Sequence, residues 1–415
     1  MAAGLCLQAG AQNWNVLEQV RGDRERLSGC EGPYRFETQA LTPAPKGYKP
    51  FYISHYGRHG SRYAWDIGTY NIIRETLKAA SEAQALTPRG TKLYSDFLVF
   101  SEEPMRNCGD LVEQGAVQQR EIARIMTKNF PEVFARGGEV LACASTIQRA
   151  IVSMSAFCIS LQKHAPKVNI TCNSLHGNMP ITSAPGATDS PDFIVREGDV
   201  FIPEAPRDFT RRTVDAEGIL DRLFTSRHFL EERGGRDKFL RQLYVLWQGY
   251  HNYSDSDFLE DIFTPEEQVA MWEAENYDNY VKHSLYRYSQ VDLLTDIVAR
   301  ADEAIAGSPY CAHLRFGHDS VVNGLCPLIN LDGGATQPQK AEDVKYWFQN
   351  FETPMAANLQ FVLYRHPRKA QILFKILRNG QEATLPQFTP VSGPYYDWDE
   401  FRSWAAELEA AHPVK

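Results

Sequence analysis

"FYISHYGRHGSRYAWD", residues Phe51–Asp66, carries two arginines and a histidine around Gly60. The preceding run "KPFYISHYG" (49–57) is rich in β-formers and stops at a glycine, which favours a strand. The following "SRYAWDIGTYNIIRETLKAASEAQ" (61–84) has helical periodicity. The stretch therefore predicts a strand-to-helix junction, the place where α/β proteins put ligand sites. Taken alone, it fits a rigid surface turn that carries charge equally well.

Two later segments repeat this layout of apolar strand, break and compact polar residues. They are "GGEVLACASTIQRAIVSMSAFCISLQKHAP" (137–166) and "CAHLRFGHDS" (311–320). Loops at the carboxyl ends of neighbouring strands converge in α/β folds, so we expect the polar residues of the three segments to share one pocket. These residues are Arg58, His59, Arg62, Arg149, His318 and Asp319.

This set of side chains suits phosphoryl transfer. Three guanidiniums, always charged and able to make forked hydrogen bonds, match a dianionic phosphate better than a single carboxylate. His59 would attack the phosphorus, and Asp319 would protonate the departing alcohol oxygen. Simpler interpretations stay open: Arg149 can be a surface cation on a helix, and the sequence around His318 can be an ordinary turn.

Metal binding is the main competing interpretation of the histidines. His55 and His59 are four residues apart, and His313 and His318 add two further imidazoles. The intervening residues lack the glutamate base of an H-E-x-x-H helix, and Arg58 would repel a divalent cation. We therefore expect no metal in the site.

The rest of the chain predicts a second, helical region. Residues 205–290 are rich in charge, aromatics and helix formers, whereas "AANLQFVLYRH" (356–366) and "AQILFKILRNG" (370–380) indicate two late strands. We predict an α/β domain made of residues 12–180 and 290–415, with a mostly helical insert at 181–289. Several cations of the insert can meet outlying phosphates or simply form a solvated helix face: Arg211, Arg212, Arg227, Arg233, Arg236 and Lys238.

Composition limits the possible partners. The 415 residues are 43% hydrophobic and 23% charged, as in ordinary globular proteins, and carry a net charge of −9. No overall basic field exists to capture nucleic acid, and no apolar run reaches the roughly 20 residues of a membrane span. We expect a small phosphorylated molecule as partner, no nucleic acid and no membrane insertion. The oligomeric state stays open.

The N-terminus and the cysteines bear on the compartment. Residues 1–11, "MAAGLCLQAGA", look like the tail of an export signal with a small-x-small cleavage pattern at Ala9-Gly10-Ala11, and a disordered terminus is the alternative. We therefore expect a periplasmic or secreted protein. Eight cysteines include no C-x-x-C pair. Seven would remain after cleavage, so at least one is free or pairs between chains.

Taken together, these motifs resemble the histidine acid phosphatase branch of the histidine phosphatase superfamily, which includes phytases and multiple inositol polyphosphate phosphatases. "YGRHGSRY" (56–63) resembles the R-H-G-x-R signature, "STIQRA" (145–150) the middle arginine segment and "GHDS" (317–320) the late H-D element. "LVEQGAVQQ" (111–119) is similar to the L-T-x-x-G-x-x-Q stretch, with Val112 in place of threonine, and "PMAANLQFVLY" (354–364) resembles the late strand. The matched elements run in the family's order from Lys46 to Tyr364.

The resemblance implies a large Rossmann-like α/β domain, with a mixed, mostly parallel sheet flanked by helices and a smaller inserted α domain. It makes His59 the nucleophile and Asp319 the general acid, and it implies no metal or organic cofactor. The phosphate clamp would consist of Arg58, Arg62, Arg149 and His318.

Two positions point to different branches of the family. Tyr63 stands where many phytases have proline, as in the multiple inositol polyphosphate phosphatases. That clade usually has H-A-E at the third motif, but the glutamate position is Ser320 here, so Asp319 must be the proton donor. We expect an inositol polyphosphate such as phytate, or another sugar-type phosphate, as substrate. A broad-specificity acid phosphatase and a non-catalytic phospholigand-binding protein are the alternatives.

Overall fold

The structure is a computed structural model that describes residues 12–37, 39–183, 203–227, 230 and 235–412. The predicted export segment, residues 1–11, lies outside the described residues, as does Arg233. The strands are β1 (Lys49–Arg58), β2 (Gly138–Ala144), β3 (Val168–Asn173), β4 (Tyr310–Gly317), β5 (Asn358–His366), β6 (Lys369–Arg378), β7 (Gln381–Ala383) and β8 (Tyr396–Asp397). The α-helices are α1 (Val16–Val20), α2 (Arg24–Leu27), α3 (Ile67–Glu82), α4 (Pro88–Phe100), α5 (Glu102–Arg106), α6 (Glu113–Asn129), α7 (Pro131–Phe134), α8 (Gln148–His164), α9 (Met179–Thr182), α10 (Pro206–Thr213), α11 (Ala216–Leu223), α13 (Gly235–Gly249), α14 (Pro265–Asn279), α15 (Val291–Ile305), α16 (Asp319–Leu328), α17 (Val344–Trp347) and α18 (Trp398–Ala411).

The strands form one mixed sheet in the order β3-β2-β4-β1-β5-β6-β7, with β8 paired to β6. The first four strands of this order are parallel to one another, whereas β5, β6 and β7 run antiparallel to their neighbours. The last seven residues of β1 are buried, as expected for a central strand that is covered on both faces. The sheet confirms the predicted fold class.

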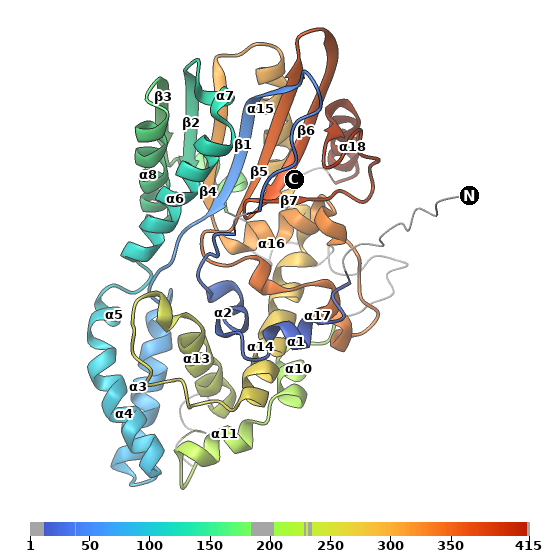
Figure 1. The fold of residues 1–415 in the computed structure, drawn as a ribbon. Coiled ribbons are helices and arrows are strands. Elements are labelled where there is room, and N and C mark those ends of the chain that lie inside the picture. Colours follow the sequence, from blue (N-terminus) through green and yellow to red (C-terminus); the bar gives the residue numbers. More distant parts are fainter. Residues whose placement is uncertain (1–11, 38, 184–202, 228–229, 231–234, 413–415) are drawn as a thin grey trace.

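Helices cover both faces of the sheet (Figure 1). One face packs against α6 and α8 through residues such as Ile122, Met126 and Phe157. The other face packs against α15, α16 and α18, where Leu294, Leu325 and Phe401 are buried. Each face therefore has its own hydrophobic core.

A third core holds the helical region together. It joins α3 and α4 to α10, α11, α13 and α14, and its largest buried side chains include Trp247 and Trp272. In Figure 1 these helices lie at the opposite end of the molecule from β2, β3 and α8. The helical region thus includes residues that precede 181–289 in the sequence, and the domain division at those bounds stays a prediction.

Local capping explains where several of these helices begin. The Asp66 side chain accepts a hydrogen bond of 2.8 Å from the Gly68 amide at the start of α3. Thr264 and Glu267 form a reciprocal capping box at the start of α14. Among the described residues, no helix is both long enough and apolar enough to cross a membrane.

Candidate active site

The carboxyl ends of three parallel strands meet at one edge of the sheet. Arg58, the last residue of β1, pairs in register with Gly317, the last residue of β4. The end of β2, Ala144, pairs with Phe316 of β4. The polar segments that follow these strands therefore lie side by side, as the sequence predicts.

All six predicted site residues come together here. A cavity of about 220 Å³ is lined by His59, Arg62, Arg149, His318 and Asp319, among others. Arg58 is fully buried beside the cavity and forms an ion pair with Asp319, with 3.2 Å between Nη2 and Oδ2. The three loops thus bring all six side chains to one pocket.

His59 is held as a neutral imidazole with one nitrogen left for chemistry. Its Nδ1 lies 2.9 Å from the Gly60 carbonyl oxygen, and because a carbonyl only accepts, Nδ1 must carry the proton. Nε2 therefore keeps its lone pair. Burial, followed by the charges of Arg58, Arg62 and Arg149, lowers the pKa of His59 well below its usual value.

The turn after His59 fits closely against α6. A Cβ built on Gly60 would lie 2.3 Å from the Gly115 carbonyl oxygen, so this position requires glycine. The Gln119 side chain donates a hydrogen bond of 2.8 Å to the Arg58 carbonyl oxygen, and Gln118 donates to Ser61. The "LVEQGAVQQ" stretch therefore holds the turn that carries His59 in place.

The three arginines differ in their partners. Arg58 Nη1 donates to the Cys30 and Thr353 carbonyl oxygens, which fixes the guanidinium from behind. Arg62 donates to the Tyr63 carbonyl oxygen through Nη1, with 3.1 Å between the atoms. Arg149 lies in the first turn of α8, where burial and then the charge of Arg62 lower its pKa to about 10.

His318 and Asp319 close the pocket on the β4 side. The Nε2 of His318 shares a hydrogen bond of 3.0 Å with the Ser145 hydroxyl, and burial followed by Arg149 lowers its pKa to about 4. Burial alone would raise the pKa of Asp319, but Arg58 and the other cations hold it well below the usual range. Ser320 only donates its amide to Asp319 and supplies no second acid.

The other two histidines of the metal interpretation, His55 and His313, do not line the pocket. His55 points into the core of the sheet, where its ring packs against Phe157 and Phe316. His313 contacts the Tyr52 hydroxyl at 2.9 Å. Because β1 ends at Arg58, His59 lies in the turn after the strand and lines the cavity, whereas His55 stays in the core, so their four-residue spacing does not bring the two imidazoles together. No group of three or more metal-binding side chains occurs among the described residues.

Sequence reasoning missed one side of the pocket. Helices α13 and α14 and the residues just after α14 contribute side chains that no motif singles out. They are Arg241, Gln248, Glu275, Asp278, Asn279, Lys282 and His283. Glu31 also lines the cavity and comes from a segment before β1. Only the cationic character of the 205–290 block gave a partial signal for this wall.

The cavity shares this wall with a larger one of about 750 Å³ among α10, α13 and α14. Arg211, Arg236 and Lys238 line the larger cavity, whereas Arg212 is paired with Glu204 and Glu342. Arg227 is likewise paired with Glu217 and Asp221. Arg211 and Arg236 also pair with Asp237, so among these described cations both the cavity-lining and the surface arginines are held by carboxylates.

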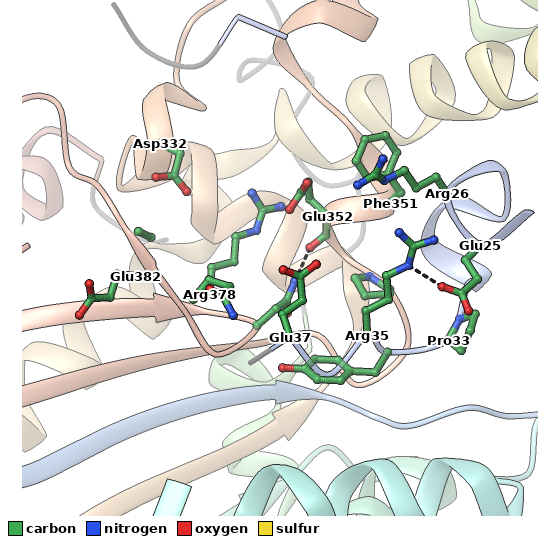
Figure 2. A pocket seen from close by; sticks show the side chains of 15 residues that line it. Glu25, Arg26, Pro33, Arg35, Glu37, Asp332, Phe351, Glu352, Arg378 and Glu382 are labelled. Atoms are coloured by element: carbon green, nitrogen blue, oxygen red, sulfur yellow. Dashed lines mark hydrogen bonds and ion pairs between the residues drawn. The ribbon is translucent and has the colours of Figure 1, made fainter. Parts of the chain in front are cut away.

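A further pocket, of about 270 Å³, lies beside the end of β6 (Figure 2). It is lined by charges of both signs, including Arg35, Arg378, Glu25 and Glu352. None of the six predicted site residues lines it. It is therefore separate from the candidate active site.

The similarity of this chain to known proteins was found by comparison with solved structures. No family model and no curated protein matches the sequence. The multiple inositol polyphosphate phosphatase of Bifidobacterium longum, in complex with inositol hexasulfate, matches with a TM-score of 0.76 and 19% identity over 93% of this chain and 98% of that chain. The phytase from D. castellii matches with a TM-score of 0.69 and 14% identity over 99% and 93%. The phytase from Citrobacter braakii matches with a TM-score of 0.57 and 13% identity over 87% of this chain and 98% of that chain. The chain therefore has the fold of multiple inositol polyphosphate phosphatases and phytases, as the resemblance predicts.

Proposed function

We propose that the protein is a phosphomonoester hydrolase that works through a covalent phosphohistidine. The observation that carries the proposal is the neutral His59, with Nε2 unprotonated, set among three arginines with Asp319 next to them. A structural histidine gains nothing from such neighbours, whereas a nucleophile that attacks a phosphate dianion needs them.

The reaction has two steps. His59 Nε2 attacks the phosphorus while the bond to the ester oxygen breaks, and the leaving alkoxide takes a proton from Asp319. Water then attacks the phosphohistidine, Asp319 accepts a proton from that water, and the phosphorus–nitrogen bond breaks to release phosphate and neutral His59. Arg58, Arg62, Arg149 and His318 stabilise the charge on the equatorial oxygens in both steps.

The substrate class that we propose is an inositol polyphosphate such as phytate, or another sugar-type phosphate. The adjoining cavity supports it, because Arg211, Arg236 and Lys238 line a space that shares lining residues such as Arg241 and Lys282 with the site. The likeness to a polyphosphate phosphatase with inositol hexasulfate bound supports the same class. A periplasmic or secreted location is also a proposal and rests on residues 1–11 alone.

The test is a phosphate-release panel of phytate, glucose 1-phosphate and an aryl phosphate, run across pH with chelator present. We expect release from the wild type and none from His59→Ala. His164→Ala, which removes an exposed histidine at the end of α8, is the matched control and should keep full activity. Undiminished turnover by His59→Ala would refute the mechanism. Tight phytate binding without release at any pH would favour the non-catalytic alternative.

A further inference from the structure

A carboxylate that belongs to none of the sequence motifs contacts the phosphate clamp. Glu31 Oε1 lies 2.8 Å from Arg62 Nη2 and 3.7 Å from Arg58 Nη2. Its side chain is 16% exposed and lines the same cavity as His59. Two of the three clamp arginines therefore share one negative charge that lies on the phosphate side of the site.

The backbone holds Glu31 in this position. Gly29 adopts φ +53°, and a Cβ there would lie 2.5 Å from Asn350 Nδ2, so the turn before Glu31 requires glycine. The Glu31 carbonyl oxygen accepts a hydrogen bond of 2.7 Å from Asn252. Arg58 itself donates to the Cys30 carbonyl oxygen. The short helix Gly29–Glu31 and the clamp are thus built as one unit.

We propose that Glu31 competes with phosphate for Arg62 and Arg58, and so sets how tightly the clamp retains phosphate. This inference rests on the proposed function in taking phosphate as the ligand of the clamp. A phosphate that reaches Arg62 Nη2 must share or displace its bond to Glu31. The phosphate oxygens then lie close to the negative charge of the Glu31 carboxylate, because the backbone at Glu31 is held in place.

The consequence concerns release of product. A clamp of three guanidiniums, of which Arg58 and Arg62 are buried, would bind inorganic phosphate tightly, and the enzyme would be inhibited by its own product. Glu31 weakens the binding of substrate and of free phosphate alike. It affects the bound substrate and the transition state equally, so it does not change the barrier between them. It is therefore a positioning residue that tunes KM and product inhibition, and it leaves the chemical step to His59 and Asp319.

Glu31→Gln tests the charge while keeping an oxygen that can accept from Arg62. Repulsion between unit charges about 4 Å apart amounts to a factor of about five even in bulk water, and a dianion increases it. We expect the inhibition constant of inorganic phosphate, and KM with it, to fall by roughly tenfold, with kcat changed less than about threefold. Glu31→Asp, which restores the charge, should return the inhibition constant toward the wild-type value.

Glu25→Gln is the matched control. Glu25 also pairs with an arginine, Arg35, on the same N-terminal segment, but it faces the separate pocket in Figure 2. This control should leave phosphate inhibition unchanged. Thermal unfolding of each variant checks that the fold is intact.

Two results would overturn the proposal. One is a phosphate inhibition constant in Glu31→Gln that equals or exceeds the wild-type value in folded protein. The other is a collapse of kcat confined to poor leaving groups, which would make Glu31 the proton donor. Calorimetric titration with inorganic phosphate gives the same comparison without turnover. If the protein binds phosphate but releases none from esters, the proposed function is wrong. The calorimetric comparison of wild type and Glu31→Gln still shows whether Glu31 weakens phosphate binding.

Discussion

Replacing Asp319 by asparagine tests the assignment of the acid, because the variant keeps the shape of the side chain but cannot deliver a proton. In the proposed mechanism the carboxyl must be protonated when the ester oxygen leaves. The neighbouring Arg58, only 3.2 Å away, holds the pKa of Asp319 well below its usual range. The substrate itself must therefore change the proton affinity of this group.

The size of that change follows from Coulomb's law. A unit negative charge about 5 Å from the carboxyl, at an effective dielectric constant of about 20, is worth roughly 3 kcal/mol. A nearby anion disfavours the ionised carboxylate. Each phosphate charge at this distance and dielectric constant therefore raises the pKa of Asp319 by about 2 units. A bound dianion can thus bring the carboxyl into the mildly acidic range where it donates.

The assay compares kcat across pH for an alkyl and an aryl phosphate. We expect the wild-type kcat for the alkyl phosphate to fall as pH rises through the pKa of Asp319 in the complex. Asp319→Asn should lose this alkaline limb and about 10²- to 10⁴-fold in rate for the alkyl phosphate, but much less for the aryl phosphate. Equal losses for the two leaving groups, or an unchanged alkaline limb, would refute the reasoning.

Two further variants test the fold around the site. His55 is buried, and burial followed by Arg315 lowers its pKa to about 3, whereas the unfolded value is about 6.5. The native state thus binds fewer protons, and stability is lost as pH falls below about 6.5, by about 2 to 3 kcal/mol at pH 4.5. His55→Leu should reduce the pH dependence of urea unfolding by this amount, and an unchanged dependence would contradict the assignment. Gly60→Ala should lower the free energy of unfolding by about 1 to 3 kcal/mol and remove most of the activity, because the new Cβ meets the Gly115 backbone. A variant with the stability and turnover of the wild type would contradict this, because it would mean that the turn can shift.

The half of the site that the strand ends supply was predictable because its residues follow a local rule. Arg58, Arg149 and His318 each lie at the end of an apolar strand or shortly after it, and parallel strands bring such positions together. The resemblance added the order of these segments. Nothing in this reasoning depended on distant packing, and the structure brings all six residues together, while their roles stay a prediction.

The other half of the site was not predictable in this way. Arg241 and Lys282 lie on helices whose charged residues all look alike in sequence, and only the tertiary packing of these helices against the rest of the molecule decides which of them face the cavity. Glu31 lies 18 residues before β1 begins at Lys49, within a short glycine-flanked turn that carries no recognisable chemistry. Contacts made over such distances are set by tertiary structure and not by a local pattern.

In the proposed mechanism, the same cations lower the pKa of both reacting groups, with opposite consequences for their roles. They lower the pKa of His59, which keeps the nucleophile neutral and reactive under acidic conditions. They also lower the pKa of Asp319, which by itself would remove the acid. Bound phosphate reverses the second effect through its own charge. His59 must be unprotonated when it attacks, and because its pKa starts well below the usual histidine value, the nucleophile tolerates the charge of the bound phosphate. With a clamp of arginines, bound substrate can therefore favour the protonated form of Asp319 while His59 stays unprotonated. Neutral hydrogen-bond donors in the same places would not give this combination.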